Sequence, residues 1–453
     1  MTPLELRASM SLASIYGLRM LGMFLILPIF AIYAETLPGG NSHLMIGLAL
    51  GAYGLTQALL QLPFGIASDR FGRKRVIYFG LLLFAIGSFI AASAHDLTWI
   101  IIGRAIQGAG AVSAAVTALV ADLTREEHRT KAMAMIGGTI GLTFAFSLVA
   151  GPALNQWIGI PGIFAMTGVL ALLALLVIKF IVPNPAVSRF HSDAEATPAR
   201  LKEVLRNGQL LRLNFGIFAL HAAQMAMFVV VPFALVQTSN LDANHHWQVY
   251  LPIMVISFVC MVPAIVYGEK KAKLKPVFVS AIALMFGAQL MFASSIHHFW
   301  GIVASLTAYF IAFNLLEASL PSLISKIAPA AAKGTAMGVY NTAQSLGVFL
   351  GGTIGGWLSH TQGYAAVFIF CSVLIGLWLS FASSMQAPMA VKSRMFHLEE
   401  LTPHAAAALA AKLAVLNGVK EAVVLAEEGV ALLKVDMAGW DETAALKLIE
   451  KGI

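Results

Sequence analysis

The sequence predicts an all-α membrane protein of twelve transmembrane helices, arranged as two pseudo-symmetric halves of six, with a small soluble α+β domain at the C-terminus. Its composition, its number of long apolar segments and an internal repeat support this fold class. Of the 453 residues, 59% are hydrophobic and 11% are charged, whereas soluble domains carry about 25% charged residues. Such a composition excludes a soluble enzyme or a nucleic-acid-binding protein. The net charge of +7 instead fits basic loops on one side of a membrane.

Twelve apolar segments are long enough to cross a bilayer, which takes about 20 helical residues. Lys and Arg lie in the loops after every second segment, and the opposite loops hold none. Because basic loops stay in the cytoplasm, we expect both termini to be cytoplasmic in the inner membrane of a bacterium. The predicted segments are 10–34, 44–67, 76–94, 98–121, 131–157, 161–182, 211–237, 247–267, 276–295, 297–325, 333–358 and 363–385.

The chain divides into two similar halves, a linker and a tail. Residues 1–182 and 211–385 each hold six segments, and 183–210 form a cytoplasmic linker with a short interfacial helix from Pro198. Pro63–Arg75 (PFGIASDRFGRKR) and Pro263–Lys275 (PAIVYGEKKAKLK) share proline, acidic and basic positions. This repeat indicates that one half is a diverged copy of the other.

The tail, residues 392–453, has the composition of a soluble domain. Its pattern predicts a strand at 394–399, a helix at 404–417, strands at 419–426 and 430–436, and a helix at 441–451. This order resembles a ferredoxin-like module. The tail has no Cys, so we expect no thiolate metal site. A regulatory or docking role with an unknown ligand or partner and a merely stabilising role both stay open.

Three motifs in the membrane part carry a family resemblance. Gly65–Lys74 reads GIASDRFGRK, Arg104–Gly108 reads RAIQG, and Gly151 and Pro152 lie together in the fifth segment. They resemble motifs of the major facilitator superfamily, and the whole chain, tail included, resembles its twelve-span drug:proton antiporters. The resemblance implies the major facilitator fold and transport of a small molecule coupled to protons. The third, which resembles the family's antiporter motif, is incomplete, with Ser147 where a Gly is usual and Asn155 and Gln156 in place of its closing Gly pair. Import by symport therefore stays open.

The first motif has a physical rationale as a conformational switch. Gly65 permits close helix approach, Gly72 permits a sharp turn, and Asp69 can accept hydrogen bonds from a helix N-terminus. The resemblance implies that this helix is the eleventh span, starting near Lys333, and that Arg73 pairs with the inner end of span four. The expected switch residues are Gly65, Asp69, Arg70, Gly72, Arg73 and Asp122.

Three charges lie deep in predicted spans, where a charge costs about 2.5–3.5 kcal/mol and usually faces a cavity or a partner. Glu317 is the one deep carboxylate and the candidate proton carrier, or else a structural group bonded to a neighbouring helix or to Arg19. For Arg19 itself a salt bridge, a substrate contact and a source of electric field are equally open. We expect Arg104 to orient Gln107 and nearby backbone, or to tune a proton site, rather than to bind substrate. The candidate proton and substrate pathway comprises Glu317, Asn314, Arg19, Arg104, Gln107 and His221.

These features favour a proton-coupled exporter of small amphipathic compounds that works by alternating access. Methionines and phenylalanines in spans one and seven provide either an adaptable apolar wall or ordinary packing. A symporter and a membrane sensor with the tail as its output are the alternatives. We expect no enzymatic activity, cofactor or metal, and we expect a monomer in membrane lipid. The wall residues are Met20, Met23, Phe24, Met225, Met227 and Phe228.

Overall fold

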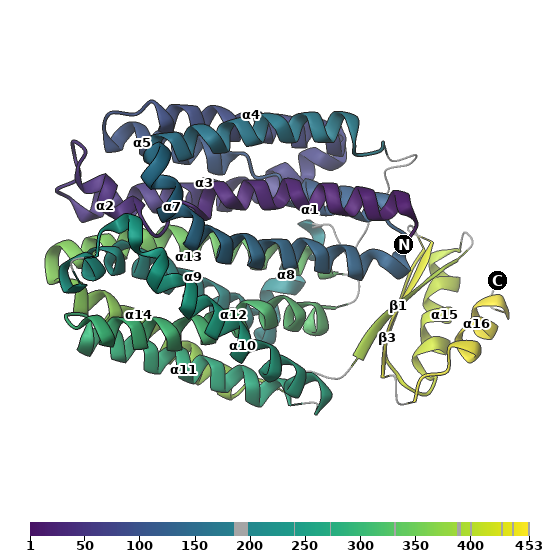
Figure 1. The fold of residues 1–453 in the computed structure, drawn as a ribbon. Helices are drawn as coiled ribbons and strands as arrows, with labels where there is room; N and C mark the ends of the chain where they lie inside the picture. The colour runs from purple at the N-terminus through teal and green to yellow at the C-terminus, as the bar shows by residue number, and fades with distance from the viewer. Residues whose placement is uncertain are drawn as a thin grey trace.

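The computed structural model describes residues 1–184, 198–239, 241–271, 273–329, 332–386, 391–398, 401–426, 429–436 and 439–451. Two bundles of long helices lie side by side, and the tail domain sits at one end of them, near the N-terminus (Figure 1). We call this the tail-side end and the other, where α2 lies, the opposite end. The predicted fold class, a mostly helical membrane bundle with a small strand-containing tail, is confirmed.

The first half comprises α1 to α7, and the second comprises α9 to α14, with α8 in the linker. The first-half helices are α1 (Pro3–Phe24), α2 (Phe30–Glu35), α3 (His43–Phe71), α4 (Arg73–Ala92), α5 (Leu97–Ala109), α6 (Ser113–Leu123) and α7 (Glu126–Phe180). Then follow α8 (Pro198–Arg206), α9 (Gly208–Ser239), η1 (Ala243–His245), α10 (Trp247–Lys270), α11 (Leu274–Ser295), α12 (Phe299–Ile327), α13 (Lys333–Gln362) and α14 (Tyr364–Ser383).

The predicted count of twelve spans is not reproduced by length and hydropathy alone. Within the described ranges, nine helical stretches are long and apolar enough to cross a membrane. One of them, α7, covers two predicted segments and reverses at Gly159, whose φ of 66° suits a glycine. Neither α1, which begins with a polar turn, nor the glycine-rich α13 is among the nine.

Glycines let α3 and α13 join the two halves near the opposite end. A Cβ at Gly352 of α13 would lie 2.6 Å from the carbonyl oxygen of Gly47, and one at Gly51 would lie 2.8 Å from that of Phe349. The helices therefore meet backbone to backbone. Small residues allow such approach in lipid, where packing and hydrogen bonds drive association.

Polar contacts between the halves also lie near the opposite end. Nδ1 of His43 lies 2.8 Å from the hydroxyl of Ser359, and the Asn155 amide donates to the Asn244 side chain at 2.7 Å. Residues 22–31, which run from the end of α1 into α2, are all buried. The bundle is therefore closed at the opposite end.

The tail is a three-stranded antiparallel sheet of order β1-β3-β2 with two helices on one face. Its elements are β1 (Val391–His397), α15 (Pro403–Ala414), β2 (Val419–Leu425), β3 (Val430–Asp436) and α16 (Glu442–Lys451). The order of elements follows the prediction. However, β1 starts three residues early because its register with β3 extends to Val391 opposite Asp436, and α15 ends at Ala414 rather than at 417.

The helix-free face of this sheet is turned towards the bundle (Figure 1). From this face, Lys434 donates to the carbonyl oxygen of Ala328 at the end of α12 with a distance of 2.5 Å. Lys434 also pairs with Glu421 on the neighbouring strand at 2.9 Å. A cation suits a helix C-terminus, because unpaired carbonyl groups give that end a partial negative charge. The tail is thus attached to the second half.

Candidate transport site and conformational switch

Arg104 of α5 organises a buried polar network in the first half. Its Nη1 donates to Oε1 of Gln107 at 3.0 Å, and its Nε donates to the carbonyl oxygen of Ala49 at 3.4 Å. The Gln107 amide in turn donates to Ser88 of α4 at 2.7 Å. Arg104 and Gln107 share a helix face because they are three residues apart. The orienting contact expected from the sequence is therefore present.

Arg19 of α1 has fewer partners. Its Nη1 donates to the hydroxyl of Ser113 at 2.7 Å, and its Cζ lies 5.6 Å from the centre of the Tyr53 ring. Cζ of Arg104 lies 5.0 Å from the same ring centre. Within the described chain, no carboxylate pairs with Arg19, so the Arg19–Glu317 bond that the sequence left open is not formed here.

In the second half, His221 of α9 lies between Glu317 of α12 and Gln344 of α13. Oε2 of Glu317 lies 3.9 Å from Nε2 of His221 in α9, beyond hydrogen-bonding distance. The amide nitrogen of Gln344 in α13 lies 2.8 Å from the same ring nitrogen, while Nδ1 lies 3.3 Å from the carbonyl oxygen of Ile217. These contacts fit a neutral imidazole that donates from Nδ1 and accepts at Nε2. Oε2 of Glu317 is buried without a hydrogen-bond partner in the described structure.

Asn314 does not join this cluster, although it lies three residues before Glu317. Its amide donates to Ser257 of α10 at 2.8 Å. It therefore ties α12 to α10 within the second half, which is a structural contact.

Phenylalanines fill the space between the two polar clusters. Phe144 of α7 lies 5.0 Å from Phe24 of α1 and 5.5 Å from Phe313 of α12, measured between ring centres. Phe313 is 5.9 Å from the ring centre of His221. This aromatic wall joins α1 of the first half to α12 of the second half. The methionines and phenylalanines expected to form a wall are buried, including Met20 and Met23.

The switch loop makes several contacts within the first half. Arg73 pairs with Asp69, and its Nε lies 3.3 Å from Oδ2 of Asp122. Its Nη1 also donates to Ser68 at 3.0 Å. Gly72 has a φ of 96°, which a side chain would disfavour. The contact that Asp69 makes here is therefore the one with Arg73.

The structure also places four further motif residues. Gly65 packs against Ala114 of α6, and Arg70 is exposed beside the Phe71 ring. Gly151 faces the backbone of α1 so closely that a Cβ would collide with the carbonyl oxygen of Leu25. Pro152 follows inside α7.

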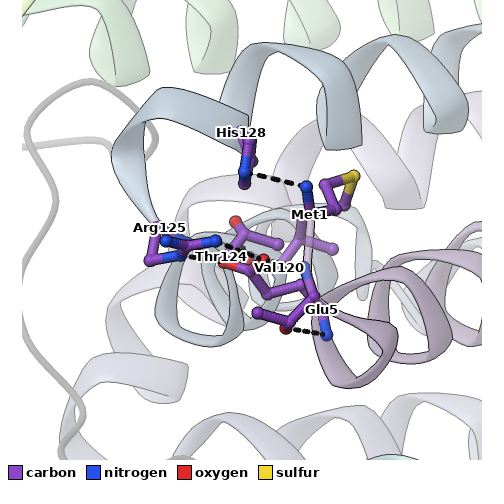
Figure 2. Close-up of polar contacts among 7 residues, drawn as sticks. Met1, Glu5, Val120, Thr124, Arg125 and His128 are labelled. Atoms are coloured by element: carbon purple, nitrogen blue, oxygen red, sulfur yellow. Dashed lines mark hydrogen bonds and ion pairs between the residues drawn. The ribbon is translucent and has the colours of Figure 1, made fainter.

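A polar cluster fastens the start of α1 to the junction of α6 and α7 (Figure 2). Glu5 accepts from the backbone and the Nε of Arg125 at 3.0 and 2.9 Å, and it completes a capping box with Thr2. The Arg125 guanidinium beside it holds the pKa of the Glu5 carboxyl well below the ordinary value. The N-terminal nitrogen of Met1 lies 2.8 Å from Nε2 of His128.

Comparison with known proteins assigns this architecture to a family. The sequence profile of the Major Facilitator Superfamily matches residues 12–352. The chain belongs to the major facilitator superfamily. This confirms the resemblance carried by the motifs, and the chain is therefore a membrane transporter of this superfamily.

Relatives within the superfamily extend over most of the chain. Inner membrane transport protein YajR of Escherichia coli (strain K12) is 44% identical, covering 96% of this chain and 95% of YajR. Quinolone resistance protein NorA of Staphylococcus aureus is 24% identical, covering 78% of this chain and 90% of NorA. A solved bacterial homologue of the human lysosomal transporter Spinster, inward-facing and occupied, matches with a TM-score of 0.66 at 14% identity, covering 85% and 98% of the two chains.

Sequence reasoning missed several partners in this superfamily member. Tyr53 stands between two arginines, and its position in a predicted span was the available signal, because a buried tyrosine hydroxyl usually needs a partner. Ser88, Ser113 and Ser257 accept the key side-chain hydrogen bonds. Serines are common in transmembrane helices, so no sequence signal singled them out.

Proposed function

We propose that this transporter is proton-coupled and exports small amphipathic compounds by alternating access. The observation that carries the proposal is the cluster of Glu317, His221 and Gln344 from three helices of the second half. A carboxyl oxygen without a hydrogen-bond partner, beside a titratable imidazole, suits the uptake and release of a proton within the membrane. Glu317 is partly exposed, so a proton can reach it.

Two sets of contacts support alternating access. The backbone contact of α3 with α13 closes the opposite end, and it must separate for that side to open. The switch loop at the tail-side end holds Asp69 on Arg73 in this state, and the start of α13 is the partner that Asp69 would take in the other state. The two ends therefore offer competing closures, each stabilising one conformation.

Export is the favoured direction, with the tail-side end in the cytoplasm. The basic loops support this orientation, and a relative named for quinolone resistance supports efflux of amphipathic compounds. Proton uptake at Glu317 would neutralise it and lower the cost of moving the site between conformations. The incomplete antiporter motif, with Asn155 bonded to Asn244 across the halves, keeps proton-coupled import as the second candidate.

The test is proton movement in proteoliposomes with an imposed pH gradient, read by a trapped pH-sensitive dye as amphipathic compounds are added. We expect substrate-dependent proton movement in the wild type and none in Glu317→Gln. The matched control is Glu203→Gln, which removes an exposed carboxylate from α8 in the linker. Coupling that survives Glu317→Gln would remove Glu317 as the carrier, and substrate and protons moving in the same direction would establish symport. If no class of compound causes proton movement, the result would favour a membrane sensor with the tail as its output.

A further inference from the structure

Arg19 is a buried cation with most of its hydrogen-bonding capacity unused. The residue is 2% exposed, and among the described residues only its Nη1 finds a protein acceptor, Ser113. Its Nε and Nη2 are buried, and no described residue accepts a hydrogen bond from them. Arg104, which is fully buried, also keeps Nη2 without a partner. The described structure offers neither arginine a carboxylate.

Such an arrangement is costly unless another group completes it. Buried charges in proteins are normally paired and fully hydrogen-bonded, because desolvation otherwise opposes burial. Here two guanidinium groups lie within 5.6 and 5.0 Å of one Tyr53 ring, so they also repel each other. The ring faces offset part of this cost by cation–π attraction. A single anionic acceptor would satisfy the free donors of Arg19 and balance the local charge.

The surroundings of Arg19 indicate the rest of that ligand. Tyr16 and Met23 lie three residues before and four residues after Arg19, on the same face of α1. Phe24 follows, packed on Phe144 at the start of the aromatic wall. A polar anion would meet Arg19, whereas an attached apolar chain would lie along methionine and phenylalanine side chains.

We infer that Arg19 binds the carboxylate of an amphipathic organic anion, which defines the substrate class of the transporter. This inference rests on the proposed transport function and deepens it. Arg19 supplies charge-assisted hydrogen bonds from Nε and Nη2, and Arg104 adds positive charge while it holds Gln107. The aromatic wall separates this anion site from the titratable cluster at Glu317.

The experiment measures binding to the purified full-length protein by thermal stabilisation in detergent. Octanoate, octanamide and octylamine present one apolar chain with an anionic, a neutral and a cationic head, and acetate and chloride present the charge alone. Variants are Arg19→Gln, Arg19→Lys and the matched control Lys179→Gln, which removes an exposed positive charge beside Phe180. All are compared at equal ionic strength, and each must elute as a folded, monodisperse protein.

We expect octanoate to stabilise the wild type and Lys179→Gln at lower concentration than the other probes. Arg19→Gln should weaken octanoate binding by about tenfold or more, the loss of a hydrogen bond to a charged group, and Arg19→Lys should weaken it less. Equal stabilisation by octanamide, octylamine, acetate or chloride, or octanoate binding that Arg19→Gln leaves unchanged, would overturn the inference. This binding assay does not measure proton movement. A failure of the proteoliposome test would therefore overturn the proposed proton coupling without changing the result for anion binding at Arg19.

Discussion

The contact between α3 and α13 allows a quantitative test of alternating access. Substituting Gly352 by Ala adds one methyl group on the face of α13 that meets α3. That methyl carbon would lie 2.6 Å from the Gly47 carbonyl oxygen and 3.3 Å from the Gly51 nitrogen. Both neighbours are backbone atoms, so no side chain can rotate away. The strain falls on the interface between the halves and spares the packing inside each half.

The size of the effect follows from the distances. A carbon and a carbonyl oxygen approach to about 3.3 Å in close contacts, so the two helices must separate by about 0.7 Å. Overpacking of this kind costs about 1–3 kcal/mol. Because the strain exists only when the opposite end is closed, the closed population should fall relative to the open one by roughly 5- to 150-fold.

The assay is a distance distribution between spin labels at the opposite end, one at Thr36 and one at Thr361, in a protein with Cys260 and Cys371 replaced. The matched control is Gly287→Ala on α11, where a Cβ would meet nothing within 4 Å. We expect Gly352→Ala to shift the distribution towards longer distances and the control to keep the parent distribution. Equal distributions in a folded Gly352→Ala variant would refute the view that the backbone contact closes this end.

Three further predictions concern contacts at the tail-side end. Arg73→Ala breaks the buried ion pair with Asp122 and should lower the free energy of unfolding by about 3 kcal/mol or more. This should be visible as a lower melting temperature, with Arg73→Lys in between, and an unchanged melting temperature would contradict it. Glu5→Gln should destabilise the protein at pH 7, and the difference from wild type should shrink as pH falls below the ordinary carboxyl pKa of 4.5. The reason is that the ion pair with Arg125 lowers the pKa of Glu5 in the folded state, so the pair stabilises the fold fully above pH 4.5 and loses this effect as the pH falls further. A stability difference between wild type and Glu5→Gln that grows in acid would refute the reasoning. Lys434→Met removes the bond to Ala328 and should raise tryptic release of the tail about tenfold, without reducing membrane insertion; release at the wild-type rate would show that other contacts hold the tail.

Much of the fold could be predicted because apolar length and basic loops are strong signals in a membrane protein. Part of the switch loop could also be predicted from the sequence. The family resemblance implied that Arg73 pairs with Asp122, and the two side chains lie 3.3 Å apart. The number of spans was harder to support. The glycine-rich α13 is not among the helices that are long and apolar enough to cross a membrane.

The polar sites were less predictable because their partners are distant in the sequence. Asn314 shares a helix face with Glu317, yet it bonds to α10, since side-chain direction and neighbours decide the contact. Gln344 meets His221 from a helix 123 positions later in the chain. Spacing along one helix predicts which residues share a face, but the tertiary packing of three helices determines which of them meet.

The composition of α13 also bears on how the protein is made. Glycines at 347, 351 and 355 lie against α9, and those at 352 and 356 lie against α3, so two faces of this helix carry little apolar side chain. Such a helix gains little free energy by entering lipid alone. We therefore expect α13 to enter the bilayer together with the strongly apolar α12 and α14 during synthesis. The stretch that gives this transporter its movable contact between halves would then depend on its neighbours for biogenesis.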